Sequence, residues 1–171
     1  MYDTNYHRAN DVADAVAKVG SSDDGKFISG GMTLLPTMKS RLAAPSDLVD
    51  VLHIGDMHGI EVAGDVVTIG AATTHADVAA NEQLASVCPA LCGLASHIGD
   101  PHVRHRGTLG GSIANNDPAA DYPSAMLALG ATIVTNKRSI SADDFYVGMF
   151  ETALDEDELV EAVSYTEPAK A

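Results

Sequence analysis

Apolar side chains recur with helical spacing near the start of the chain. Within residues 11–19 they stand at i, i+3, i+4 and i+7, which predicts an amphipathic helix. Asn10 precedes this run and is the expected N-cap, and Gly20 is expected to end the helix. The inner stripe of the helix would be formed by Val12, Ala15, Val16 and Val19.

A short apolar run, a helical pattern and a second apolar run follow. The runs at 27–29 and 48–52 are expected to be strands, and the pattern at 34–42 a helix with Pro36 in its first turn. This alternation predicts a small β/α unit, which we assign to an N-terminal subdomain of residues 1–54. The apolar face of its second helix would be formed by Leu34, Leu35, Met38 and Leu42.

The pattern becomes richer in strands after residue 54. Two pairs of short β-type runs are joined by turn residues, Gly64-Asp65 in one pair and Asn136 in the other, so both pairs are expected to be hairpins. These features predict a second α+β subdomain, residues 55–171. Its strands are expected at 60–62, 66–69, 131–135, 137–140 and 159–163, and helices are expected to begin at Thr74, Pro89 and Ser141.

Two pairs of adjacent glycines stand where turns between strands and helices are expected. Gly30-Gly31 follows an apolar run, and Gly110-Gly111 is flanked by the hydroxyls of Thr108 and Ser112. Because glycine has no Cβ, the backbone can bend there and a ligand can approach the main chain closely. The second pair is equally consistent with an anion or nucleotide cradle and with a tight packing turn. The first segment matches neither the Rossmann nor the Walker glycine pattern.

Two aspartates follow the second glycine pair, one helical turn apart. Asp117 and Asp121 could accept hydrogen bonds from ribose or ribityl hydroxyls. The alternative role is helix capping, and Asp121 is the expected N-cap of a helix with Pro123 in its first turn and Gly130 just after its end. Both roles stay open for Asp121. The inner face of that helix would be formed by Ala125, Met126 and Leu129.

A basic loop precedes the second glycine pair, and it contains His97, His102 and His105. These histidines lack the regular spacing of metal ligands, and the interleaved Arg104 and Arg106 disfavour a further cation, so no metal site is expected. The loop could neutralise a ligand phosphate or an acidic face of a partner. It could equally pair with Asp100 and Asp117.

Composition narrows the class of protein. The chain has 171 residues, of which 46% are hydrophobic, and a formal net charge of −14, which opposes binding to nucleic acid or to an anionic membrane. No apolar run approaches the roughly 20 residues of a membrane helix, and the N-terminus lacks the features of a secretory signal. We therefore expect a soluble cytoplasmic protein without membrane insertion. Cys88 and Cys92 are expected to be buried thiols rather than ligands of a metal or an iron–sulfur cluster.

The two glycine segments together resemble a known family. Ser-Gly-Gly-Met-Thr-Leu-Leu-Pro-Thr-Met-Lys-Ser-Arg at 29–41 and Arg-His-Arg-Gly-Thr-Leu-Gly-Gly-Ser-Ile-Ala-Asn-Asn-Asp-Pro-Ala-Ala-Asp-Tyr-Pro at 104–123 are similar to the FAD-binding (medium) subunit of molybdenum hydroxylases. The similarity is greatest to the aerobic carbon monoxide dehydrogenase type, with xanthine dehydrogenase more distant. It covers nearly the whole chain, including Tyr-His-Arg at 6–8 and Thr-Ala-Leu-Asp-Glu-Asp-Glu-Leu-Val at 152–160.

This resemblance implies an α+β, vanillyl-alcohol-oxidase-like (PCMH-type) fold of two subdomains with FAD between them. Backbone amides of the first glycine segment would hold the pyrophosphate, and the second segment would form another clamp. Asp121, with Asp117 beside it, would bind cofactor hydroxyls, and apolar residues would line the pocket and flank the isoalloxazine. The implied FAD contacts are Ser29, Gly30, Gly31, Met32, Thr33, Ile98, Thr108, Leu109, Gly110, Gly111, Ser112, Asp117, Asp121, Leu159 and Val160.

The resemblance also implies a function and partners. The chain would be an oxidoreductase subunit that passes electrons from iron–sulfur clusters through FAD to an acceptor, together with a molybdopterin-binding large subunit and a 2Fe-2S small subunit. Ser112 stands where some branches carry Asn, which agrees with the carbon monoxide dehydrogenase type. Family members continue into a third domain beyond the residues present here. The alternative function is therefore a non-catalytic assembly module without stable FAD binding.

Overall fold

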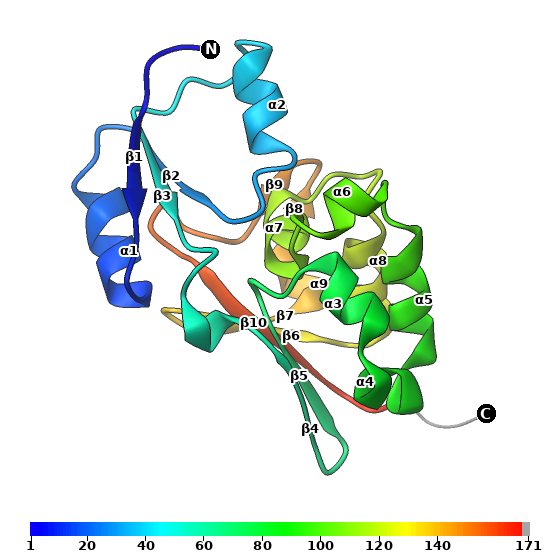
Figure 1. Ribbon diagram of the computed structural model, residues 1–171. Coiled ribbons are helices and arrows are strands. Elements are labelled where there is room, and N and C mark those ends of the chain that lie inside the picture. The colour runs from blue at the N-terminus through cyan, green and yellow to red at the C-terminus, as the bar shows by residue number, and fades with distance from the viewer. Residues whose placement is uncertain (169–171) are drawn as a thin grey trace.

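The computed structural model describes residues 1–168, which form a three-stranded, a five-stranded and a two-stranded sheet; Figure 1 shows the first two of these apart from one another. The N-terminal sheet is parallel, with its three strands in the order β1-β3-β2. Two helices connect these strands and lie beside the sheet. The elements are β1 (Asn5–Arg8), α1 (Val12–Gly20), β2 (Gly25–Ile28), α2 (Leu34–Lys39) and β3 (Asp47–Asp50).

The first helix forms where the apolar spacing predicts it, and Ala15 and Val19 are buried against the parallel sheet. Its N-cap is Asp11 and not Asn10, because the Asp11 carboxylate accepts the backbone N–H of Asp14 at 2.8 Å. Asn10 instead donates its own backbone N–H to the Asp14 carboxylate at 2.9 Å. The expected cap was therefore wrong by one residue.

The second helix is shorter than its apolar pattern predicts. It ends at Lys39, and Arg41 adopts a left-handed backbone with φ of 61°. Leu42 therefore lies outside the helix and is 82% exposed, so its predicted place on the inner face was wrong. Met38 is buried and packs with Ile28 and Leu48 in a small core of its own.

The second sheet has five strands in the order β4-β5-β10-β6-β7, and all its pairings are antiparallel. Both predicted hairpins are confirmed, since β4 pairs with β5 and β6 with β7. The last strand, β10, lies in the middle and so joins the two hairpins into one sheet. The strands are β4 (Ile60–Ala63), β5 (Val66–Gly70), β6 (Thr132–Thr135), β7 (Ser139–Ser141) and β10 (Val160–Thr166).

Figure 1 shows helices α3 to α8 gathered on one side of the five-stranded sheet. Thr74 and Ser141 each cap a helix as predicted, since their hydroxyls accept the backbone N–H three residues later. The remaining elements are η1 (Gly55–Met57), α3 (His75–Ala80), α4 (Glu82–Val87), α5 (Pro89–His97), α6 (Pro101–Arg104), α7 (Leu109–Asn115), α8 (Asp121–Ala128), α9 (Ala142–Phe145), β8 (Tyr146–Gly148) and β9 (Glu151–Thr152).

Two expectations around the second glycine pair were wrong. Gly110 and Gly111 do not form a turn between a strand and a helix, because they lie in the first turn of α7. Asp121 is not an N-cap, because Ala120 occupies that position and Asp121 is the first residue of α8. Gly130 follows the C-cap Leu129 with φ of 56°, as expected of a glycine after a helix.

One large apolar core joins residues from both sides of position 54. It includes Val49 and Val51 at the end of the parallel sheet and Val67 and Ile69 in the antiparallel sheet. The division into subdomains 1–54 and 55–171 stays a prediction. No helix among the described residues is both long and apolar enough to cross a lipid bilayer.

Candidate functional site

A cavity of about 610 Å³ lies between the two glycine segments. This volume is within the usual range for sites that hold a small molecule or a cofactor. Most of the residues that the resemblance implies as FAD contacts line it: Ser29, Gly30, Gly31, Met32, Thr33, Ile98, Thr108, Gly110, Gly111, Ser112, Asp117, Leu159 and Val160. The sequence segments 29–33, 108–112 and 159–160 are thus brought together around one space.

The first glycine segment connects β2 to α2 and offers free backbone donors. Among the described residues, the N–H groups of Gly30 to Thr33 donate no hydrogen bond to any other group of the protein. Gly31 has φ of 71°, a conformation that glycine adopts without strain. Several successive unpaired N–H groups on the wall of a cavity suit an anionic ligand such as a phosphate.

Gly30 is required for a different reason. A Cβ at this position would lie 2.1 Å from the carbonyl oxygen of Arg106 and 2.7 Å from Cα of Gly107. The first glycine segment therefore packs directly against the backbone that leads into the second one. The glycine pair predicted that a ligand would approach the main chain closely. At Gly30 the close approach is instead made by another segment of the protein backbone.

The two glycines of the second segment have distinct roles. A Cβ on Gly110 would lie 2.4 Å from Cβ of Ala71, so Gly110 permits α7 to pack against the end of β5. A Cβ on Gly111 would meet only the Thr108 hydroxyl, at 3.0 Å, and Gly111 is exposed toward the cavity. The packing interpretation thus holds for Gly110, and the space beside Gly111 is left for a ligand.

Most backbone donors in the first turn of α7 are already used within the protein. Leu109 donates to the carbonyl of Thr73 at 3.0 Å, Gly110 to that of Ala71 at 2.8 Å, and Gly111 to the hydroxyl of its N-cap Thr108 at 3.2 Å. What this segment offers to the cavity is therefore hydroxyl groups. The Ser112 hydroxyl lines the cavity and makes no hydrogen bond to another described residue.

Two predicted contacts do not line the cavity. Leu109 is fully buried beneath α7, where it belongs to the apolar core. Asp121 is exposed at the start of α8, whereas Asp117 lines the cavity and accepts the backbone N–H of Ala119 at 2.9 Å. Of the two carboxylates considered for cofactor hydroxyls, Asp117 has the better placement for that role, and the role of Asp121 stays a prediction.

Several lining residues were not identified from the sequence. His75 lines the cavity at the start of α3 and is almost fully buried, and burial lowers its pKa to about 4. Asp155, Glu156 and Glu158 line it in the loop before β10. A histidine next to a capping threonine and an acidic run in a loop are common surface features, so the sequence carried no signal for either.

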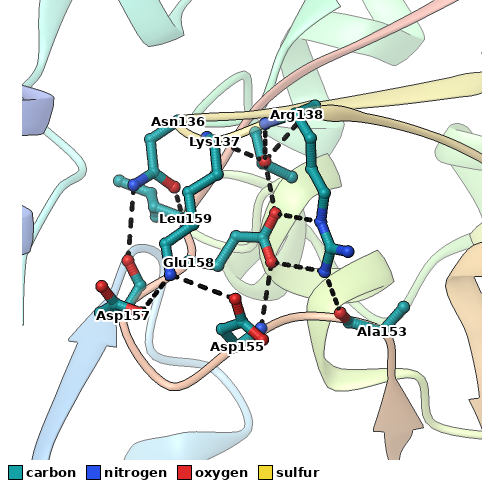
Figure 2. Close-up of polar contacts among 9 residues, drawn as sticks. Asn136, Lys137, Arg138, Ala153, Asp155, Asp157, Glu158 and Leu159 are labelled. Atoms are coloured by element: carbon teal, nitrogen blue, oxygen red, sulfur yellow. Dashed lines mark hydrogen bonds and ion pairs between the residues drawn. The ribbon is translucent and has the colours of Figure 1, made fainter.

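Figure 2 shows how a network of polar contacts holds the loop that leads to Leu159 and Val160. The Glu158 side chain is fully buried, and both its carboxylate oxygens accept hydrogen bonds from Arg138, at 3.0 and 2.9 Å. Thr135 also donates to Glu158, at 2.6 Å. The hydrogen bonds from Arg138 are the main reason that the pKa of Glu158 falls to about 2. Glu158 is therefore ionised and neutralised by its partner at neutral pH.

The same network fixes the loop at three further points. Lys137 forms ion pairs with Asp155 and Asp157, Asn136 accepts the backbone N–H of Leu159 at 2.7 Å, and Arg138 donates to the carbonyl of Ala153 at 2.6 Å. The residues that hold the loop, Asn136, Lys137 and Arg138, all lie in the turn between β6 and β7. This turn therefore positions the apolar wall of the cavity at Leu159 and Val160.

The basic loop before the second glycine segment does not form the ion pairs considered for it. Within residues 1–168 neither arginine of the loop lies within ion-pair distance of Asp100 or Asp117. Arg104 instead donates to the carbonyls of Ile98 and Gly99, and Arg106 borders a second cavity of about 220 Å³. No group of three or more His, Cys, Asp or Glu side chains in this described part could hold a metal ion. Cys88 and Cys92 are buried free thiols, as predicted.

The chain is similar to one family of proteins both in sequence and in structure. A family model described as the FAD binding domain in molybdopterin dehydrogenase matches residues 2–165. The carbon monoxide dehydrogenase medium chain of Afipia carboxidovorans is 41% identical over 170 residues, which cover 95% of this chain and 58% of that protein. The nicotine 6-hydroxylase medium subunit of Paenarthrobacter nicotinovorans is 37% identical over 153 residues, which cover 87% of this chain and 54% of that protein.

A solved structure of the Cu,Mo-CO dehydrogenase in its cyanide-inactivated form is similar with a TM-score of 0.94 and 38% identity. The match covers 99% of this chain and 61% of that chain. The likeness confirms the expected α+β FAD-binding fold of the PCMH type. The chain spans less than two thirds of the length of each of these relatives.

Proposed function

Because the chain belongs to the family of FAD binding domains in molybdopterin dehydrogenases, we propose that it binds FAD in the cavity between its two glycine segments. The observation that carries this proposal is the run of unpaired N–H groups from Gly30 to Thr33 on the cavity wall. These donors would hold the FAD diphosphate, since successive backbone N–H groups form a concave site for anions. They would do so without a cluster of lysines or arginines, in a chain whose net charge is −14.

The part of the cavity wall formed by the loop before β10 suits the ring system of FAD. Leu154, Leu159 and Val160 form an apolar wall, and Asp155 and Glu156 stand beside it. Lys137 already neutralises Asp155, so the charge that would repel a diphosphate is mainly that of Glu156. A neutral aromatic ring would instead pack against the apolar side chains. The direction of FAD in the cavity is therefore set by charge, with the diphosphate at the glycine segments and the isoalloxazine toward β10.

Bound FAD would supply the transfer of electrons between a donor and an acceptor. In the proposed function the chain is the flavoprotein part of a molybdenum hydroxylase. Electrons would reach it from a 2Fe-2S small subunit, after oxidation of a substrate at a molybdopterin-binding large subunit, and would leave to an acceptor. The residues of this chain would bind the cofactor, orient it and exclude water from it.

Calorimetric titration with FAD and with two fragments of it tests the proposal. ADP carries the diphosphate, whereas riboflavin carries the ring and the ribityl chain without phosphate. We expect FAD to bind, ADP to compete with it, and riboflavin to bind much more weakly. A folded chain that binds none of the three would contradict the proposal and would favour the alternative of an assembly module without FAD.

A further inference from the structure

His75 ties helix α3 to the second glycine segment. It is the first residue of α3, and its backbone N–H donates to the carbonyl of Gly107 at 3.0 Å. Its side chain lines the cavity although only 5% of the residue is exposed. A polar side chain in such a place needs a hydrogen-bond partner, because an unsatisfied buried polar group is destabilising.

The imidazole has one enclosed nitrogen and one nitrogen near the cavity. Nδ1 is fully buried and has no hydrogen-bond partner among the described residues. The ring of Tyr122 lies beside it, with 5.4 Å between ring centroids, and the buried Tyr122 hydroxyl also has no partner within residues 1–168. The histidine can therefore reach a ligand only through the edge that carries Nε2.

Gly107 allows that edge of the ring to lie directly against the backbone of the second glycine segment. A Cβ on Gly107 would lie 2.6 Å from Nε2 of His75, so any side chain there would overlap the ring. Gly107 directly precedes Thr108, whose hydroxyl donates to Ser29 in the first glycine segment at 3.1 Å. Nε2 thus lies where the two glycine segments meet.

The ring is neutral near pH 7, because burial lowers the pKa of His75 to about 4. A neutral imidazole carries one N–H, on either nitrogen. A proton on Nδ1 would be a buried donor without an acceptor, whereas a proton on Nε2 can be shared with a ligand in the cavity. The arrangement therefore favours the tautomer with the proton on Nε2.

We propose that His75 is a cofactor-binding residue whose Nε2–H donates a hydrogen bond to a diphosphate oxygen of FAD at the junction of the two glycine segments. This inference rests on the proposed function. It adds a side-chain donor from α3 to the backbone donors of Gly30 to Thr33, so that the diphosphate is held from two elements. Gly107 is then needed because any side chain at this position would displace the imidazole ring.

Three substitutions separate hydrogen bonding from packing. His75→Gln places an amide N–H near the position of Nε2, His75→Asn places one near Nδ1, and His75→Phe keeps a flat ring without a donor. We expect His75→Gln to bind FAD within about threefold of the unsubstituted chain, and the other two to bind at least about tenfold more weakly. His102→Gln, on the exposed surface of α6, is the control and should leave the affinity unchanged.

Nitrogen NMR of the ¹⁵N-histidine-labelled chain gives a readout that does not depend on affinity. The Nε2 resonance of His75, identified by its absence in His75→Gln, should show the protonated form of a neutral ring and should shift on addition of FAD. Thermal unfolding of each variant shows whether it is folded, and His75→Asn keeps the test valid if His75→Phe does not fold.

Two results would overturn the inference while leaving the proposed function intact. One is FAD binding by His75→Asn with the affinity of the unsubstituted chain. The other is an equal loss in His75→Gln and His75→Asn, which would indicate packing alone. Failure of the unsubstituted chain to bind FAD would instead contradict the proposed function.

Discussion

The hydroxyl of Thr108 donates a hydrogen bond to the hydroxyl of Ser29 at 3.1 Å, and this bond joins two glycine segments that are 79 residues apart in the chain. Thr108 in turn accepts the backbone N–H of Gly111. Because Ser29 accepts from Thr108, the proton of its own hydroxyl is left for a ligand in the cavity. The pair therefore joins two walls of the cavity and leaves the Ser29 hydroxyl able to donate to a ligand.

Ser29→Ala should weaken FAD binding with little effect on folding. The substitution removes the hydroxyl on the cavity side and leaves Thr108 as the N-cap of α7. Thr108→Val should also destabilise the fold by about 1 kcal/mol, because it removes that cap. Urea unfolding and FAD titration measure the two effects. Equal stability losses in both variants would contradict the assignment of ligand binding to Ser29 and of helix capping to Thr108. Ser124→Ala, on the exposed side of α8, is the control.

Gly111→Val should abolish FAD binding and leave a folded protein. The new side chain would meet only the Thr108 hydroxyl, which can shift slightly, and would otherwise occupy the cavity. Gly110→Val should not fold, because its Cβ would overlap Ala71. Gly93→Val, in α5 with no atom within 4 Å of the new Cβ, controls for valine in a helix. Circular dichroism of the three variants measures their folding, and FAD titration measures their affinity. Normal FAD affinity of Gly111→Val would contradict the proposed site.

The pH dependence of stability should reveal the buried carboxylate of Glu158. Its pKa is about 2 in the folded chain, mainly because Arg138 donates to it, and its ordinary value is 4.5. A lowered folded pKa means that the stabilisation is present above pH 4.5 and is lost as the pH falls toward 2. Urea unfolding of the parent chain and of Glu158→Gln between pH 6 and 2 should show a difference in stability that shrinks across this window. A constant difference would contradict the assignment.

Arg138→Ala should destabilise the chain clearly, because it leaves the buried Glu158 carboxylate without its cation. Lys137→Ala should have a much smaller effect, since its ion pairs with Asp155 and Asp157 are exposed. Arg138→Lys keeps the charge and loses the two parallel hydrogen bonds, so its stability should lie between those two variants. Equal stability of all three would show that the network of Figure 2 does not hold the loop.

Replacement of both cysteines by alanine should leave FAD binding unchanged. Cys88 and Cys92 are buried, free and absent from the cavity wall, and burial raises the pKa of Cys92. Each substitution removes about one methyl-sized group from the core, so a loss of about 1 kcal/mol per site is expected. In the folded parent chain neither thiol should react with a thiol reagent. Rapid labelling of either thiol would show that this part of the core opens readily.

The apolar spacing along the chain determined the helices and strands with the clearest periodicity. It placed α1 and both hairpins correctly, because one buried face imposes a fixed period on each element. It placed the N-cap of α1 one residue too early and extended α2 to Leu42. Asn10 and Asp11 are both good caps, and nothing in the local pattern shows that the chain turns at Arg41. Those choices depend on contacts with the rest of the fold.

The sequence by itself also indicated the two glycine segments of the candidate site, since hydroxyls next to paired glycines are informative without any structure, and the family resemblance added Leu159 and Val160. Only the tertiary structure decided how each residue is used. It packs Gly30 on the backbone of Arg106 and Gly110 on Ala71, and it leaves Gly111 facing the cavity. It also brings His75 to the cavity from a distant helix. These roles follow from distances between segments far apart in the chain, and local patterns carry no information about such distances.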